Sequence, residues 1–349
     1  MNHTESRSFR PLSPQHQPSR ILIIRLHATG DVAITFPYCT SLRKSFPNAQ
    51  IDFLTTEPCA DLPKALTIFD NVLIFPHCAN RWGRVQHTLA WCAKIPKVYY
   101  DVVIDLQRNW VSRAIRRSAF PTFWGEFDRY STNAAGDRVL DTFQRTGFDS
   151  IRPVCRMEIR HDVMDHAENI LGKHGWDGAT RLVVLNPAGL WKTRNWPIEN
   201  YAELANLWLA EERVQFLLMG TGRIDLKARY IAEKLPDSTI NLVDKTTLAE
   251  AFGIVQYASA VVSEDSGLMH MAWVSGIPTL ALFGSSRHDW SRPLGEHTLC
   301  FHSGDLECWA CMKAECKYGD VHCLTRYRAE YIYEMTQKLL HSSASKLAL

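Results

Sequence analysis

The feature that most constrains the fold is an alternation of short apolar runs with stretches of helical spacing. The first run, ILIIRL at residues 21–26, is continuous and rich in β-branched residues, as expected for a strand buried on both faces of a parallel sheet. The turn HATGD follows, apolar residues recur at helical spacing from Val32 to Phe46, and IDFLT supplies the next strand. This order forms a βαβ unit and predicts a parallel sheet covered by helices.

The alternation starts twice along the chain, which indicates two doubly wound α/β domains. Strands are predicted at NVLIFP and YDVVIDLQ, and a second start at RLVVLNPAG leads through VQFLLMG, STINLV, ASAVVS and IPTLALFG. A length of 349 residues also favours two domains over one. We place the domains at residues 21–165 and 175–335, with a disordered N-terminal tail over 1–20 and a C-terminal tail over 336–349.

Composition excludes several classes of protein. The 39 Lys and Arg residues nearly balance the 37 Asp and Glu residues, which argues against a dedicated nucleic-acid binder. No apolar run reaches the roughly 18 residues of a membrane-spanning helix, and the polar N-terminus lacks the apolar core of a signal peptide. We expect a cytoplasmic protein in which most of the ten cysteines are reduced thiols.

Polar residues crowd the turn between the predicted strand ASAVVS and the predicted helix LMHMAWVS. We expect residues Glu264 to Gly267 and His270 to be exposed there. The first amides of the helix and its dipole would make an anion site. Asp265 or Ser266 could equally cap the helix, and the residues alone leave the two interpretations open.

Two other turns at strand ends offer chemistry. Asp31, preceded by Gly30, either caps the first helix or acts as a general base toward a hydroxyl, and the residues alone favour the cap. In LWKTRNWP, Lys192 and Arg194 precede a helix that Pro197 would open, and two cations at that place suit a diphosphate better than a role as solvated surface charges. Turns at the carboxyl ends of two facing sheets would line one cleft.

The turn GTGRID, residues 220–225, imitates a dinucleotide fingerprint, but Asp225 replaces its third glycine. Hydrogen bonding of a nucleotide ribose by Asp225 is therefore favoured over nicotinamide binding. The segment 105–129 is rich in arginine, which indicates either the wet face of a helix, formed by Arg113, Arg116 and Arg117, or a patch for an anionic acceptor. The candidate acceptor residues are Asp105, Gln107, Arg108, Arg113 and Arg129.

Four cysteines near the C-terminus have C-x2-C-x4-C-x6-C spacing. They are Cys308, Cys311, Cys316 and Cys323, with His302 and His322 nearby. A structural zinc or iron site is one interpretation, although the spacing is tighter than in common zinc ribbons. Packing of a short tail against the core is preferred, and we predict no metal or cofactor for the chemistry.

Four segments together resemble the bacterial heptosyltransferases of glycosyltransferase family 9, over nearly everything from Ile21 to about Met335. They are TGDVAITFP, DVVIDLQRNW with the later GEFDR, NPAGLWKTRNWP, and SEDSGLMHMAWVSGIPTLALFG. The resemblance implies a GT-B fold, in which two Rossmann-like domains face each other across a cleft and the C-terminal domain binds the donor. It also implies ADP-L-glycero-D-manno-heptose as donor and a Kdo or heptose hydroxyl of the lipid A–Kdo core as acceptor.

The resemblance also assigns roles to residues. Asp31 falls on the family's catalytic base, which reverses the preference for a cap, and the implied reaction is a single inverting displacement. Arg194 takes the place of a usual lysine, and Thr246 falls near the adenine site. Arg108 stands where glycine is frequent, and Trp273 replaces a small residue. The implied donor-binding residues are Gly30, Gly189, Lys192, Arg194, Asp225, Thr246, Asp265, Ser266, Gly267, Leu268 and His270.

Two alternatives to this function stay open. One is a related transferase that uses another nucleotide sugar or a protein acceptor. The other is a non-catalytic member that binds a nucleotide or scaffolds an assembly. A lipid-linked acceptor would in addition imply peripheral contact with the inner membrane.

Overall fold

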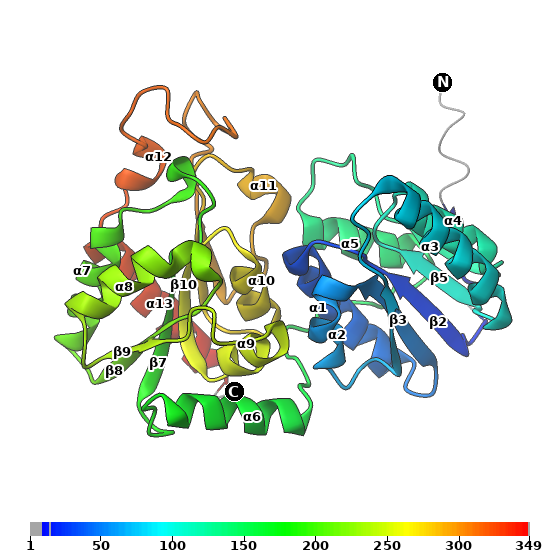
Figure 1. The fold of residues 1–349 in the computed structure, drawn as a ribbon, viewed down its shortest axis with the longest axis horizontal. Helices are drawn as coiled ribbons and strands as arrows, with labels where there is room; N and C mark the ends of the chain where they lie inside the picture. Colours follow the sequence, from blue (N-terminus) through cyan, green and yellow to red (C-terminus); the bar gives the residue numbers. More distant parts are fainter. Residues whose placement is uncertain (1–8, 14, 348–349) are drawn as a thin grey trace. The chain divides into compact units, whose positions relative to one another are not determined.

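The protein consists of two compact units, Met1–Arg160 and His161–Leu349. The computed structural model describes residues 9–13 and 15–347. Each unit is built on one six-stranded sheet (Figure 1). The predicted α/β class with two Rossmann-like, doubly wound domains is therefore confirmed.

The sheet of the first unit has the strand order β1-β6-β5-β2-β3-β4 and is parallel except for its edge strand β1. The continuous apolar run forms β2, whose residues Ile21 to Ile24 have no exposed surface because helices cover both faces of the sheet. The strands are β1 (Phe9–Arg10), β2 (Arg20–Ile24), β3 (Gln50–Thr56), β4 (Asn71–Phe75), β5 (Val102–Asp105) and β6 (Phe123–Glu126). The helices are α1 (Thr29–Ser45), α2 (Asp61–Lys64), α3 (Arg81–Lys94), α4 (Trp110–Ser118) and α5 (Ala135–Arg145).

The sheet of the second unit has the order β12-β11-β10-β7-β8-β9, and every pair in it is parallel. Its strands are β7 (Arg181–Asn186), β8 (Val214–Leu218), β9 (Thr239–Asn241), β10 (Ala258–Glu264), β11 (Thr279–Leu282) and β12 (Thr298–Phe301). Its helices are α6 (His161–Lys173), α7 (Ile198–Leu209), α8 (Asp225–Lys234), α9 (Leu248–Val255), α10 (Gly267–Val274), α11 (His288–Ser291), α12 (His322–Thr325) and α13 (Ala329–Leu347). A short 3₁₀ turn, η4 (Lys192–Arg194), follows β7.

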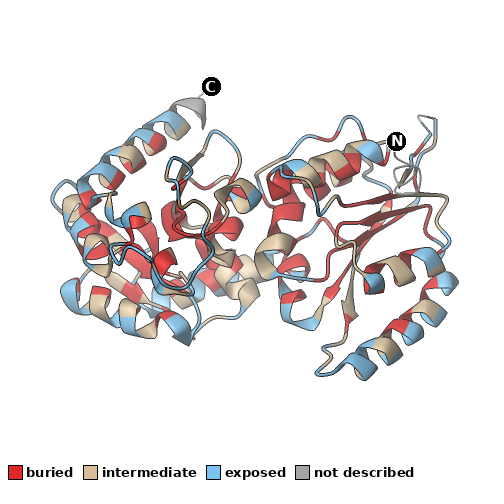
Figure 2. Ribbon diagram, turned by 90° about the horizontal axis from the view of Figure 1, so that it is seen from above, coloured by how far each residue is buried: buried red, intermediate tan, exposed pale blue. Residues whose placement is uncertain are grey.

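Within each unit the central strands are buried and the edge strands β1, β4 and β12 are partly exposed, while the helices turn one buried face toward the sheet and one exposed face outward (Figure 2). In both sheets the strand order reverses beside the first long strand, between β2 and β5 in one unit and between β7 and β10 in the other. Loops that leave the carboxyl ends of such a pair run in opposite directions and leave room for a ligand. These two places are where the functional residues are to be sought.

Both predicted tails are partly ordered. Phe9 and Arg10 pair antiparallel with Trp124 and Gly125 of β6, so the expectation of a disordered segment over 1–20 is wrong for the part that the structure describes. Residues 1–8 and 14 lie outside the described residues. The predicted tail 336–349 falls in α13 as far as Leu347, because Ile332 and Leu339 bury that helix against the core of the second unit.

The predicted boundary between the domains cuts through α6. The structure divides the chain before His161, so that α6 belongs wholly to the second unit, where Ala167 and Val163 pack against Gly253 of α9. Among the described residues no helix has both the length and the apolarity to cross a membrane.

Candidate functional site

The turn after β2 holds Asp31 between a buried cation and the start of α1. Arg25 Nη2 lies 2.7 Å from Asp31 Oδ2, and the Arg25 side chain is 8% exposed whereas that of Asp31 is 41% exposed. The backbone N–H of Ala28 donates to the same carboxylate at 3.3 Å. Asp31 lies in the first turn of α1, which begins at Thr29, and accepts this bond from the N-cap residue Ala28. The expectation that Asp31 itself is the N-cap is therefore wrong, and part of its carboxylate remains exposed to solvent.

Gln107 and Asp105 hold the loops around this turn. Gln107 Oε1 accepts hydrogen bonds from the backbone N–H groups of Leu26 (2.9 Å) and His27 (3.2 Å). Asp105 has no exposed surface and accepts from the backbone of Arg108 at 2.9 Å and from Ser112 Oγ at 3.0 Å. Burial raises the pKa of Asp105 despite these bonds. In this structure its carboxyl group fixes the β5–α4 loop and does not face outward toward a sugar.

The arginine-rich segment is organised around the buried carboxylate of Glu126, which the sequence did not single out. Arg113 binds it with both ends of its guanidinium group, Nε at 3.1 Å and Nη2 at 3.0 Å. Arg116 also pairs with Glu126, and Arg108 Nε lies 3.6 Å from it. Burial by itself would raise the pKa of Glu126, but the bonds and charges of Arg113 and Arg116 outweigh burial and lower it.

The interpretation of a wet helix face is wrong for Arg116, which is 4% exposed, and holds for the exposed Arg117. Arg108 has a positive φ of 49° and a second partner in Asp128 at 3.3 Å. Of the predicted acceptor residues, Arg129 is the one that lies fully on the surface.

A cavity of about 390 Å³ opens at the carboxyl edge of the first sheet, next to the turn that carries Asp31. Its lining includes Ala28 and Thr29 of that turn. The other polar residues of this cavity were not identified from the sequence. They lie at or after the carboxyl ends of parallel strands, or near the start of the helices that follow, and this position could have indicated them. They include His27, Thr56, His77, Arg84 and Asn109.

In the second unit a buried glutamate ties together the turn after β7. Glu264 accepts a hydrogen bond from the backbone N–H of Gly189 at 2.5 Å and another from that of Trp196 at 2.6 Å. Lys227 Nζ lies 3.9 Å from the same carboxyl group. Burial raises the pKa of Glu264 to about 7, while Lys227 and the two amides oppose the shift. The expectation that Glu264 is exposed is wrong, because it closes the base of the turn.

Gly189 is required in this turn by close packing. A Cβ at that position would overlap the carbonyl oxygen of Arg194 and the side-chain oxygen of Asn195. The turn thereby brings η4 against Gly189, with Lys192 exposed and Arg194 half-buried. Arg194 Nη2 donates to the backbone oxygen of Asp265 at 2.9 Å and pairs with its carboxylate at 2.6 Å. The turns after β7 and β10, predicted to act together, are therefore in direct contact.

The start of α10 combines a cap with a fixed histidine. Ser266 Oγ accepts from the backbone N–H of Met269 at 3.3 Å, so the capping interpretation is confirmed for Ser266, with Gly267 and Leu268 in the first turn. His270 is buried, contrary to expectation, and its Nδ1 accepts from the indole N–H of Trp273 at 2.9 Å. The unusual tryptophan thus fixes the orientation of the His270 ring.

The remaining predicted donor residues lie apart from this cluster of contacts. Asp225 pairs with Arg229 at 2.8 Å within α8, and Thr246 is half-buried in the loop before α9. Asn186, at the end of β7, was missed. Its Nδ2 donates at 2.8 Å to both Ser263 Oγ and Ser266 Oγ and so joins the two central strands at the site.

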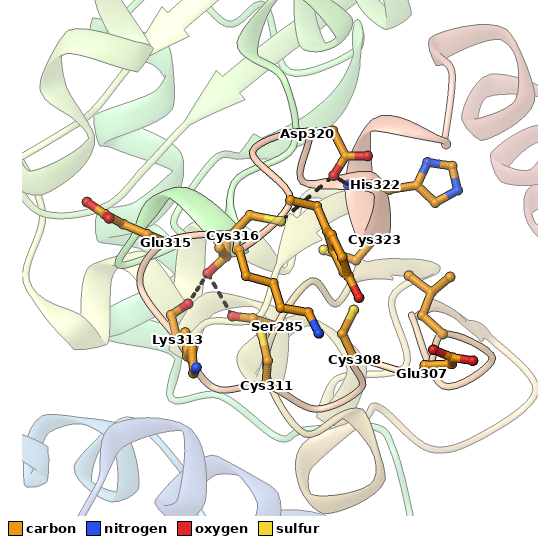
Figure 3. Close-up of a pocket in the computed structure, with 14 residues that line it drawn as sticks. Ser285, Glu307, Cys308, Cys311, Lys313, Glu315, Cys316, Asp320, His322 and Cys323 are labelled. Carbon is orange, nitrogen blue, oxygen red and sulfur yellow. Dashed lines mark hydrogen bonds between the residues drawn. The ribbon is translucent and has the colours of Figure 1, made fainter.

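The four C-terminal cysteines line a separate cavity of about 410 Å³ (Figure 3). None of them forms a disulfide. Cys316 and Cys323 pack against the core of the second unit, as the preferred interpretation expected, whereas Cys311 is exposed.

Two α/β units, each built on one six-stranded sheet with a loop cluster at its carboxyl edge, are the architecture of the GT-B class. Residues 138–322 match glycosyltransferase family 9 (heptosyltransferase). Lipopolysaccharide heptosyltransferase 2 of Salmonella typhimurium is 34% identical over 309 residues, which are 79% of this chain and 85% of that protein. The chain belongs to glycosyltransferase family 9.

Solved structures agree on the fold. The family 9 glycosyltransferase of Veillonella parvula superposes with a TM-score of 0.79 at 20% identity, covering 93% of this chain and 97% of that one. The E. coli heptosyltransferase WaaC with ADP-2-deoxy-2-fluoro heptose superposes with a TM-score of 0.62 at 19% identity, covering 91% and 99%.

Proposed function

We propose that the protein transfers heptose from ADP-L-glycero-D-manno-heptose to a Kdo or heptose hydroxyl of the lipopolysaccharide inner core, with inversion at the anomeric carbon. The proposal rests mainly on Asp31. Its carboxylate is half-exposed and lies at the carboxyl edge of the first sheet, beside a cavity. The Salmonella relative named as a lipopolysaccharide heptosyltransferase, and the WaaC structure that contains an ADP-heptose analogue, support this donor and this class of acceptor.

In the proposed reaction Asp31 removes the proton of the acceptor hydroxyl as the oxygen attacks the anomeric carbon. The ion pair with Arg25 and the Ala28 amide hold the carboxylate in one orientation. The bond from the anomeric carbon to the diphosphate breaks as the new glycosidic bond forms, with oxocarbenium character in the transition state. The cavity lined by Ala28, Arg84 and Trp110 is assigned to the acceptor sugar, where the arginine would recognise an anionic group.

The departing ADP is assigned to the second unit. Lys192 is exposed, and Arg194 lies beside the first turn of α10, whose amides and dipole favour negative charge. A diphosphate at this place would compete with Asp265 for Arg194, so donor binding is expected to rearrange that ion pair. Asp225 and Thr246 are assigned to the nucleoside end of the donor. A lipid-linked acceptor would bring the protein to the cytoplasmic surface of the inner membrane.

The proposal is tested by incubating the full chain with ADP-heptose and cores of defined truncation, and reading the products by mass. We expect one core length to gain the mass of a single heptose residue, and NMR of the product to show an inverted anomeric configuration. Reaction with none of the cores would overturn the proposal.

The alternatives are separated by a thermal-shift screen of nucleotide sugars, because a ligand that binds the folded state stabilises it more when its concentration is further above its Kd. Stabilisation by a different nucleotide sugar alone would favour a related transferase. Stabilisation by ADP-heptose, with no transfer to any core or protein, would favour a non-catalytic binding protein.

A further inference from the structure

The connection between β12 and α12 is long and has almost no core of its own. Residues 302–321 contain neither helix nor strand, whereas loops longer than about 12–15 residues are uncommon in compact domains. Of these residues, all of which the structure describes, only Ser303 and Val321 are buried. Apolar burial is therefore too small to account for a single conformation of this loop.

Four thiols gather in this loop. Cys308, Cys311 and Cys316 belong to it, Cys323 follows in the first turn of α12, and all four line the cavity of about 410 Å³. Figure 3 shows the labelled cysteines around this cavity, with the His322 ring turned away. Four thiols that line one cavity are a set of soft ligands that a thiophilic metal ion can bind together.

The ligand types select the cation. Two cysteines separated by two residues can chelate one ion, and four thiolates in tetrahedral geometry suit zinc or iron. His302, a further nitrogen ligand in the segment, is instead stacked on His288 with ring centroids 3.7 Å apart. As the described side chains are placed, no three His, Cys, Asp or Glu residues are within reach of one ion. Coordination must therefore draw the thiols inward, which a loop without helix or strand can accommodate.

We propose that Cys308, Cys311, Cys316 and Cys323 together bind one thiophilic transition-metal ion, zinc or iron, as four thiolate ligands. Each thiol releases its proton to solvent as its sulfur bonds to the metal, so that four protons leave for each ion bound. Because residues 302–321 bury little apolar surface, the bound ion instead stabilises one conformation of this loop.

The loop that the ion would fix contacts η4, the turn after β7 that we assign to the donor diphosphate. The Thr193 hydroxyl, between Lys192 and Arg194, donates to the carbonyl oxygen of Lys313, and the N–H of Met312 donates to the carbonyl oxygen of Ser285 at 3.0 Å. Thr193 and Ser285 also line the cavity and bond each other at 2.9 Å. Metal binding would thus stabilise η4 through these hydrogen bonds, whatever sugar the enzyme transfers.

The test is the metal content of the full chain, purified under reducing, oxygen-free conditions without chelator. We expect about one equivalent of zinc or iron per chain by mass spectrometry, and colour in the oxidised protein identifies iron. After exchange with Co²⁺, visible bands of tetrahedral cobalt and a thiolate-to-cobalt charge-transfer band should appear. The variant Cys308→Ser/Cys311→Ser should lose the metal, whereas the matched variant Cys92→Ser/Cys155→Ser, in the first unit, should keep it.

The wild-type chain provides an independent readout if the first variant does not fold. Zn²⁺ added to apoprotein should raise the melting temperature and Mg²⁺ should not. Less than about a tenth of an equivalent of metal in protein reconstituted with zinc or iron would overturn the proposal. Disulfides among the four cysteines in the protein as purified, or metal retained by Cys308→Ser/Cys311→Ser, would also overturn it.

Discussion

Replacing Gly189 with alanine tests how tightly the turn after β7 is held. A Cβ at this position would overlap Arg194 and Asn195, so the turn would have to open and break the 2.5 Å bond to the buried Glu264. Unfolding is measured at a pH above about 8, where Glu264 with its pKa of about 7 is ionised. A hydrogen bond to a charged group contributes about 1.5–3 kcal/mol, and overpacking costs about 1–3 kcal/mol. We therefore expect Gly189→Ala to lower the free energy of unfolding by roughly 3–5 kcal/mol.

The assay is urea unfolding followed by tryptophan fluorescence, which reports on Trp196 and Trp208 in the core of the second unit. The melting temperature should fall by roughly 6–20 °C for a domain of this size. Gly172→Ala is the matched control, because a Cβ there meets nothing within 4 Å in α6 of the same unit. This control should be neutral or stabilising by up to about 1 kcal/mol. Equal stability of the two variants would refute the packing argument.

Three further predictions concern the ionised groups. Arg116 is buried against a buried carboxylate and Arg117 is exposed, so Arg116→Met should cost about 3–5 kcal/mol in urea unfolding and Arg117→Met less than about 0.5 kcal/mol; similar losses would contradict the ion-pair account. Burial raises the pKa of Glu264 from 4.5 to about 7, so the folded protein keeps a proton that the unfolded chain releases. The unfolding free energy of wild type, measured relative to Glu264→Gln, should therefore fall by about 3 kcal/mol as the pH rises from about 4.5 to above 7. A difference between the two proteins that does not change with pH would show that the pKa of Glu264 is not raised. Finally, Lys192→Ala/Arg194→Ala should bind ADP-heptose at least about tenfold more weakly in calorimetry, and wild-type binding should weaken as salt rises; unchanged affinity would remove the phosphate role.

Apolar periodicity predicted both sheets because each strand is a short, locally encoded run. ILIIRL and RLVVLN became β2 and β7, and IENYAELANLWL became α7. The strand ends then predicted where polar residues meet, since carboxyl ends of parallel strands share one edge. Contact between the turns after β7 and β10 followed from this rule alone.

Elements whose stability comes from distant partners were not predictable in this way. The two residues of β1 are ordered by pairing with β6, more than a hundred positions later, and carry no local signal. The burial of charged side chains could not be predicted from the sequence either. Glu264, Asp105 and Arg116 are buried because the fold supplies hydrogen bonds or an opposite charge to each of them. A sequence shows the residue type and leaves its partner undetermined.

The central claim, that Asp31 is the base of a heptose transfer, is tested most directly by the transfer rate of Asp31→Asn at saturating ADP-heptose. Asparagine keeps the size of the side chain and an oxygen that can accept the Ala28 N–H bond, but it removes the negative charge that faces the buried Arg25. The melting temperature should therefore fall, while the folded variant should bind ADP-heptose with an affinity close to that of wild type. Transfer should fall by about 10² or more. A variant that transfers heptose as fast as wild type would contradict the claim.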